Sequence, residues 1–394
     1  MAIYLDHAAS TPVRPEVAKL IAEHFGEQGN PAAVHGFGQS SKMQLEQARE
    51  DIAAILNCDR NEVIFTSGGT EANNLAVFGI FDARDARNQD QDRPIVLCLG
   101  TEHHAVLEAV EALEKSGRAE VHLIPVDRQG LPDTEWLQAF LTEHSDRVAL
   151  VAAIWANNET GSVVNMAELA DICKRLQIPI HTDAVAAVGH LPVDYRSLGV
   201  STLAFTGHKL GAPVGVGALL VGRGVKVSPR AFGGSQERGI RPGTQDSIGA
   251  SALALATKLA VSELSEHRSN WEMLRSRLIA GVQAAVPEVI VVGAESPAQR
   301  LPNIVNFVFP GCAGESLLFL LDTAGVAISN GSACTAGVTG GSHVLQAMGF
   351  DSKDSASCVR VSFGASTSVA DIDEFLSALP DAHARAKKAG FTAG

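Results

Sequence analysis

Three polar side chains, each placed just after an apolar run, could together perform acid–base and amine chemistry. His103 follows the run 94–99, Asp183 follows 178–182, and Lys209 follows 201–205. A lysine amine can form an imine with a carbonyl carbon, a carboxylate can hold a proton on a ring nitrogen, and an imidazole can transfer protons. Taken singly, each residue has an ordinary explanation, since aspartates at strand ends commonly shape turns and lysines are commonly solvated.

A glycine-containing segment supplies a possible site for an anion. Residues 67–70 read Ser-Gly-Gly-Thr, follow the apolar run 62–66 and open a predicted helix. Glycine lets the backbone approach a ligand closely, and the free N–H groups of a helix start attract an anion. On these four residues alone, a phosphate cradle and a plain turn are equally good interpretations. The nucleotide-binding patterns GxxxxGKS/T and GxGxxG do not occur.

An amine, an acid, an imidazole and a phosphate cradle are together the set that pyridoxal 5'-phosphate requires. In this interpretation Lys209 carries the cofactor, Asp183 keeps its pyridine nitrogen protonated, and His103 lies on the ring face and transfers protons. The residues predicted to surround the phosphate are Gly69, Thr70, Thr206 and His208.

Alternating strand-like and helix-like segments must bring these residues together. The predicted strands are 62–66, 94–99, 120–125, 148–155, 178–182 and 201–205. Several are apolar throughout, as strands buried on both faces are. Helical stretches such as 44–56 intervene, so the sequence predicts an α/β fold with a mostly parallel, doubly wound sheet. Such sheets bind ligands beyond the carboxyl ends of their strands, where the polar residues stand.

The last third of the chain has a different pattern. Long helical stretches cover 250–277, and the segments that follow predict a smaller α+β unit. Its predicted elements are strands 289–292, 303–309, 326–329 and 359–362, a helix 315–321 and a final helix from Val369. We place the boundary near residue 262. The predicted domains are a large one, 14–262, and a small one made of 1–13 and 263–394.

Composition limits the possible partners. The 394-residue chain carries a net charge of −13, which disfavours nucleic acid and anionic membranes as partners. No apolar run approaches the roughly 20 residues that a membrane span requires. The first ten residues show no basic region followed by an apolar one, so a cytoplasmic location is expected.

The six cysteines include no CxxC pair, so neither a metal site nor a disulfide framework is predicted, and most should be buried, reduced thiols.

Cys334 is the exception among the cysteines. It lies in SNGSACTAG, residues 329–337, and ten of the thirteen residues from 329 to 341 are Gly, Ala, Ser or Thr. This composition predicts a mobile loop that carries an exposed thiol. No Asp, Glu, Lys or Arg occurs between Asp322 and Asp351, so no neighbour in sequence lowers the pKa of this thiol. We expect Cys334 to react slowly with alkylating reagents when substrate is absent.

The chain resembles the cysteine desulfurases of the NifS/IscS type, which belong to the class V aminotransferase-like enzymes of pyridoxal phosphate fold type I. The resemblance extends over nearly the whole chain and depends on the order and spacing of many motifs. These are YLDHAASTPV (4–13), GNPAAVHGFG (29–38), FTSGGTEANNLA (65–76), TEHHAVL (101–107), NNETG (157–161), HTDA (181–184), TGHKLGAPVGVGALL (206–220), GGSQERGIRPGT (233–244), NGSACTAG (330–337), SHVLQAMG (342–349) and VRVSFG (359–364).

The resemblance implies roles for further residues. Arg360 would bind the substrate carboxylate, for which its planar guanidinium is suited, and Asn158 would assist. Cys334 would be the nucleophile that takes the substrate sulfur as a persulfide. Thr244 would reach the cofactor phosphate of a partner subunit, which implies a homodimer. The implied reaction converts L-cysteine to L-alanine and passes the sulfur to an acceptor or scaffold protein, for iron–sulfur cluster assembly or thiolation.

One residue departs from the family pattern. The third residue after the aspartate is commonly a glutamine that donates to the cofactor's ring oxygen, but here it is Ala186. The departure predicts an altered imine pKa or slower turnover rather than loss of the cofactor. Two alternatives to the desulfurase interpretation stay open. The chain could be a selenocysteine lyase or another β-lyase of the same family, or a weakly active sulfur-carrier platform that serves to bind a scaffold partner.

Overall fold

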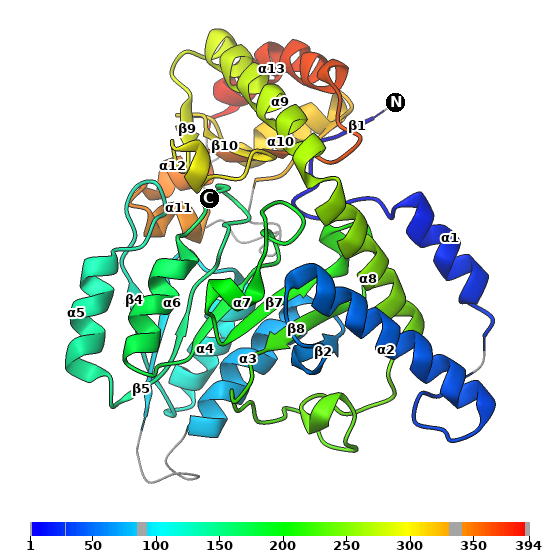
Figure 1. The fold of residues 1–394 in the computed structure, drawn as a ribbon. Coiled ribbons are helices and arrows are strands. Elements are labelled where there is room, and N and C mark those ends of the chain that lie inside the picture. The colour runs from blue at the N-terminus through cyan, green and yellow to red at the C-terminus, as the bar shows by residue number, and fades with distance from the viewer. Residues whose placement is uncertain (1, 28, 85–92, 331–340, 391–394) are drawn as a thin grey trace.

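The protein is described from a computed structural model that covers residues 2–27, 29–84, 93–330 and 341–390 (Figure 1). A large sheet with its helices occupies the lower part of Figure 1, and a smaller layer of helices and strands lies above it.

The large sheet has seven strands in the order β2-β8-β7-β6-β5-β3-β4. The strands are β2 (Val63–Thr66), β3 (Ile95–Leu99), β4 (Glu120–Ile124), β5 (Val148–Ala152), β6 (Ile180–Asp183), β7 (Thr202–Thr206) and β8 (Gly217–Val221). β3 to β7 pair in parallel, whereas β8 is antiparallel to both β7 and β2. The predicted α/β class with a mostly parallel sheet is confirmed. No strand was predicted at β8, because this run of five residues follows a glycine-rich segment that is typical of turns.

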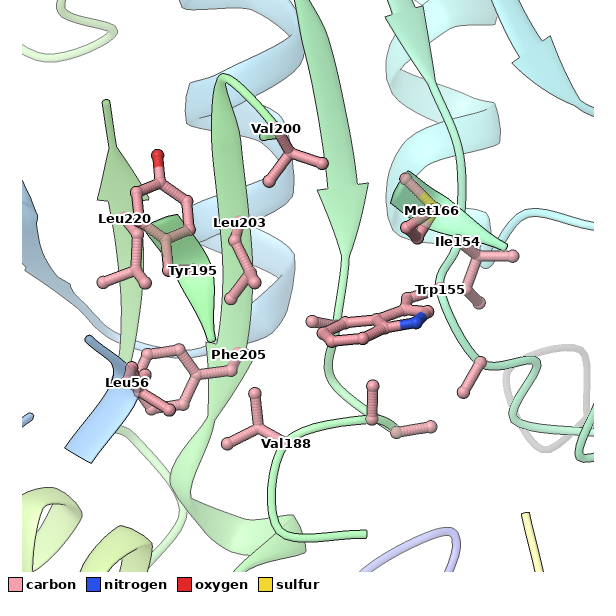
Figure 2. Close-up of a cluster of buried hydrophobic side chains, with 14 of the residues drawn as sticks. Leu56, Ile154, Trp155, Met166, Val188, Tyr195, Val200, Leu203, Phe205 and Leu220 are labelled. Atoms are coloured by element: carbon pink, nitrogen blue, oxygen red, sulfur yellow. The ribbon is translucent and has the colours of Figure 1, made fainter. Parts of the chain in front are cut away.

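Apolar side chains bury both faces of this sheet. Along β3, Ile95, Leu97 and Leu99 belong to one buried cluster, while Val96 and Cys98 belong to another on the opposite face. Successive residues of a strand point to opposite faces, so an apolar strand of this kind requires helices on both sides. Figure 2 shows part of the first cluster around Trp155 and Phe205.

The helices of this region are α1 (Pro15–His24), α2 (Gly36–Leu56), α3 (Gly69–Arg84), α4 (His104–Lys115), α5 (Thr134–His144), α6 (Met166–Arg175), α7 (Tyr195–Leu198) and α8 (Ser247–Ser262). Helices alternate with the strands from β2 to β7, whereas α1 and α2 both precede β2 and α8 follows β8. α3 and α4 contribute to the second cluster, whereas α2, α5, α6 and α8 contribute to the first.

The smaller layer is built around a three-stranded antiparallel sheet of order β12-β10-β9. Its strands are β9 (Ile290–Val292), β10 (Ile304–Val308) and β12 (Cys358–Ser362), and its helices are α9 (Leu264–Ala285), α10 (Gly314–Thr323), α11 (His343–Ala347), α12 (Ser352–Ala356) and α13 (Val369–Ala389). Near the N-terminus, β1 (Ile3–Tyr4) pairs in parallel with β11 (Val326–Ala327). Residues from both ends of the chain therefore share one layer, and α8 and α9 meet at a 64° bend close to residue 262. The exact domain limits stay a prediction.

Among the described residues, no single helix is long and apolar enough to cross a membrane, and only the bent pair α8 and α9 has the length and composition for it when taken together. In the same residues, no group of three or more His, Cys, Asp or Glu side chains is arranged to hold a metal ion.

Candidate active site

A cavity of about 270 Å³ opens where strands of the large sheet end. Loops that follow β2, β3, β5, β6 and β7 contribute to its wall, together with β12 of the smaller layer. Nine residues singled out from the sequence line it: Gly69, Thr70, His103, Asn158, Asp183, Thr206, His208, Lys209 and Arg360. The topology thus brings together residues that are as far apart as 291 positions (360 − 69) in the chain. Their chemical roles remain predictions.

Lys209 stands in a short 3-10 helix, Gly207–Lys209, immediately after β7. Its ammonium Nζ donates to the backbone carbonyl of Ala8, which also lines the cavity. The neighbouring His208 is desolvated and lies beside this cation, and both effects lower its pKa to about 4. At neutral pH the histidine next to Lys209 is therefore uncharged and can accept or donate a hydrogen bond.

Asp183 is oriented by a buried chain of hydrogen bonds. The Asn73 amide Nδ2 donates to Asp183 Oδ2 at 2.6 Å, and the backbone N–H of Val185 donates to Oδ1 at 2.9 Å. On its other side, Asn73 Oδ1 lies 2.9 Å from His181 Nε2, and His181 Nδ1 lies 2.9 Å from the Thr202 hydroxyl. Because an amide oxygen only accepts, His181 must donate through Nε2. Burial lowers the pKa of His181 to about 3, so its ring is neutral.

His103 is held at the start of α4. Its Nδ1 accepts from the backbone N–H of Ala105 at 3.1 Å, so the neutral ring carries its proton on Nε2. Burial lowers the pKa of His103, and the positive charge of Lys209 lowers it further, although Asp183 acts in the opposite direction. The ring therefore favours its neutral form, which can act as a base or as a hydrogen-bond donor.

Arg360 projects from β12 into the same cavity and is only 2% exposed. Its Nη2 donates to Asp6 Oδ1 at 2.6 Å and its Nη1 donates to the backbone carbonyl of Asn158 at 2.9 Å. These two contacts fix the plane of the guanidinium. A fixed guanidinium in a largely apolar cavity is a suitable receptor for a carboxylate.

The backbone at the start of α3 fits a phosphate cradle. A Cβ atom added to Gly69 would lie 2.7 Å from Val185 Cγ2, so only glycine lets the chain pass this closely to the wall of the cavity. Thr70 and Thr206 line the same end of the cavity with hydroxyl groups. The described residues therefore offer a phosphate site, an amine and a carboxylate, and this donor set fits pyridoxal phosphate.

Two of the predicted site residues, Thr244 and Cys334, are not among the described residues that line this cavity. Thr244 is exposed and does not line it. Cys334 belongs to residues 331–340, which are outside the described part of the structure. Ala186 does line the cavity, with 8% of its surface exposed, so a small side chain stands at the position where the family commonly has glutamine.

Several wall residues were not predicted from the sequence. They include Asn73, which orients Asp183, and His343, whose Nε2 donates to the Glu102 carbonyl at 2.9 Å. Asp6, the carboxylate partner of Arg360, was also missed. All three belong to motifs that carry the resemblance, but their partners come from distant parts of the chain, and a single sequence does not show such pairs.

The cysteines in the described residues are free thiols, as predicted for most of them. Cys98, Cys173, Cys312 and Cys358 are buried, and Cys58 is partly buried. Burial raises the pKa of Cys58 and Cys173 to about 12 and that of Cys312 to about 11. The pKa values of Cys98 and Cys358 are raised as well, so each of these five thiols is poorly nucleophilic at neutral pH.

The fold and the site define an α/β enzyme of the pyridoxal phosphate fold type I class, with a smaller α+β layer over the carboxyl edge of its sheet. The chain belongs to the aminotransferase class-V family, whose sequence profile matches residues 3–375. It is 43% identical to an IscS-like cysteine desulfurase of Mycobacterium tuberculosis, over 99% of this chain and 98% of the relative. It is 37% identical to the cysteine desulfurase NifS of Azotobacter vinelandii, over 96% of this chain and 92% of the relative.

Solved structures agree with this assignment. A NifS-like protein superposes with a TM-score of 0.87 at 30% identity, covering 97% of this chain and 99% of that protein. A second NifS-like protein, from Rickettsia africae, gives a TM-score of 0.86 at 28% identity, covering 98% of this chain and 100% of that protein. The resemblance to cysteine desulfurases of the NifS/IscS type is confirmed.

Proposed function

We propose that this protein is a cysteine desulfurase that converts L-cysteine to L-alanine and retains the sulfur as a persulfide on Cys334. The observation that carries this proposal is the convergence of Lys209, Asp183, His103 and Arg360 on one cavity, in a chain whose relatives are named cysteine desulfurases. Each of these four groups supports a distinct requirement of the reaction.

Pyridoxal phosphate, when bound, would supply an electron sink for cleavage at the substrate's α and β carbons. Lys209 would hold the cofactor covalently, and Asp183 would hold a proton on the ring nitrogen. Asn73 keeps the Asp183 carboxylate aimed in one direction by donating to it at 2.6 Å. The glycine-lined start of α3, with Thr70, Thr206 and His208, would bind the phosphate.

The substrate would be oriented by its carboxylate. Arg360 is held by Asp6 and by the Asn158 carbonyl, so its charge has a defined position before substrate arrives. A preorganised cation reduces the entropic cost of placing the substrate. The neutral His103 would then accept or donate a proton at the reacting atoms, a role that its lowered pKa favours at neutral pH.

We also propose that the protein works as a homodimer. Thr244 is exposed and lies outside the cavity of its own chain, which is consistent with a role at a partner's phosphate. Large apolar side chains are exposed as well: Val34 by 89%, Val214 by 81% and Phe232 by 87%. Of these three, Phe232 is aromatic, and aromatic side chains are enriched in protein interfaces. A sulfur-acceptor protein and a cytoplasmic location stay predictions of the sequence.

The direct test is to incubate the purified protein with L-cysteine and a reductant and to measure alanine and sulfide. We expect both products from the unaltered protein, and neither above background from Lys209→Ala or Cys334→Ala. Selenocysteine as the alternative substrate separates the proposal from a lyase, because selenium release should depend less on the Cys334 thiol. Cofactor uptake without alanine formation would contradict the proposal and favour a non-catalytic sulfur carrier.

A further inference from the structure

The carboxylate of Glu71 contacts the predicted phosphate cradle, residues 67–70, but does not line the cavity. Glu71 follows Thr70 in the first turn of α3, and its Oε2 accepts from the backbone N–H of Ser67 at 2.5 Å. The cradle, residues 67–70, is therefore bound to a negatively charged side chain of its own helix. A carboxylate and a phosphate this close in sequence would compete for the same positive end of the helix.

Arg241 neutralises this carboxylate from a distant segment. Its Nε donates to Glu71 Oε1 at 2.9 Å, and its Nη2 lies 3.4 Å from Oε2. The pair is about two-thirds buried, with 29% and 32% of the side chains exposed, so solvent screens it only partly. Burial would raise the pKa of Glu71, but the hydrogen bonds from Arg241 and Ser67 outweigh it, and the pKa is lowered. Glu71 is thus ionised at neutral pH.

The segment that carries Arg241 is held in place by a second ion pair. Arg49 and Glu237 form two parallel contacts of 2.8 Å, with 8% and 0% of their side chains exposed. Glu237 also accepts from the backbone N–H of Phe65 at 2.9 Å, on the strand that leads into the cradle. Glu237 and Arg238 have positive φ angles of 48° and 60°, a conformation that non-glycine residues adopt at a cost.

We propose that Arg241 is a positioning residue for the cofactor phosphate, which holds Glu71 on the Ser67 N–H and cancels its charge beside the cradle. The inference rests on the proposed function, since it assumes that the cradle binds the phosphate of pyridoxal phosphate. Loss of Arg241 would leave an uncompensated carboxylate next to the phosphate. Loss of the Arg241 and Glu71 charges together would remove the repulsion between the Glu71 carboxylate and the phosphate.

The test is a titration of cofactor-free protein with pyridoxal phosphate, followed by visible absorbance. We expect Arg241→Gln to raise the dissociation constant about tenfold at low ionic strength, and Glu71→Gln to change it by less than about threefold. The double variant should return to the value of Glu71→Gln alone. Pyridoxal, which lacks the phosphate, should bind all variants equally. Asp373→Asn, which breaks the exposed pair between Arg277 of α9 and Asp373 of α13, is the matched control and should have no effect.

Three outcomes would overturn the inference: unchanged affinity in Arg241→Gln, a double variant as weak as Arg241→Gln, or equal weakening toward pyridoxal. The first would show that the charge of Glu71 does not reach the phosphate, and the other two would indicate a general structural role. If the unaltered protein takes up no pyridoxal phosphate, the proposed function fails together with this inference. Normal uptake with an unaffected Arg241→Gln variant overturns this inference alone.

Discussion

At the scale of single residues, Asp183 depends on neighbours that are themselves uncharged. Asn73 donates to its carboxylate, and Asn73 is oriented in turn by the neutral ring of His181. Both side chains are essentially buried, so each polar atom needs a partner. This chain of hydrogen bonds determines which way the carboxylate points in the cavity.

Replacing Asn73 with leucine tests that chain. Asn73→Leu keeps the side-chain volume but leaves Asp183 Oδ2 and His181 Nε2 without their present partner, at about 1–3 kcal/mol for each unpaired group. We expect at least tenfold weaker binding of pyridoxal phosphate in an absorbance titration. Asn165→Leu, which removes an exposed contact to Glu168, should leave the affinity unchanged. Equal affinity of the two variants would contradict the orienting role.

Ala186 is the second residue with a specific expectation. Its small side chain lines the cavity and offers no hydrogen-bond donor. Ala186→Gln should restore a donor near the ring oxygen, and we expect a shift in the pH at which the absorption of the bound cofactor changes, or a faster turnover. Identical spectra, pH titration and rate in the two proteins would show that the missing glutamine is compensated.

At the scale of elements, the strand ends of the large sheet carry most of the residues that line the cavity. Arg360 comes from β12 of the smaller layer, and the buried core of that layer keeps this strand in place. Within this layer, α13 contributes Phe375 to the core, where it is fully buried together with Phe307 of β10 and Leu317 of α10. Phe375→Ala should lower the free energy of unfolding by about 3–5 kcal/mol, because it removes a buried ring and leaves a cavity. Denaturant titration measures the loss. Phe319→Ala, at a side chain that is 71% exposed, should cost far less.

At the scale of the whole molecule, desolvated histidines make stability depend on pH. Burial lowers the pKa of His181 to about 3 and that of His190 to about 4, from 6.5. Below pH 6.5 the unfolded chain binds protons on these residues while the folded protein does not, so stability decreases as the pH falls toward 4. The slope is about 1.4 kcal/mol per pH unit for each proton. His190→Gln should flatten it by about one proton in denaturant titrations between pH 6.5 and 4.5, and an unchanged slope would contradict this assignment.

The proposed dimer is also tested at this scale. Phe232 is 87% exposed, and an acidic side chain in its place would put a charge into an apolar interface. We expect Phe232→Glu to shift the protein from dimer to monomer in sedimentation experiments. The matched variant Phe319→Glu changes an exposed phenylalanine of the small layer and should stay dimeric. A monomeric unaltered protein would refute the dimer itself.

Local pattern and residue order were enough to predict the class of fold and some of the residues that line the cavity, whereas Arg360 and Asn158 were expected only from the family resemblance. Apolar runs separated by amphipathic stretches indicated a parallel sheet, and parallel strands must present their carboxyl ends at one edge. His103, Asp183 and Lys209 could therefore be grouped without coordinates. The antiparallel strand β8 was missed because a short run after glycines carries no periodic signal of its own.

The amino-acid sequence by itself determined which chemical groups are available and at which strand ends they stand. Only the tertiary structure decided which direction each group points in and which protonation state its surroundings favour. Asp6 meets Arg360 across 354 residues, Asn73 meets Asp183 across 110, and Arg241 meets Glu71 across 170. Hydrogen-bond direction, burial and charge compensation depend on distances between such remote atoms, and these distances exist only once the chain has folded.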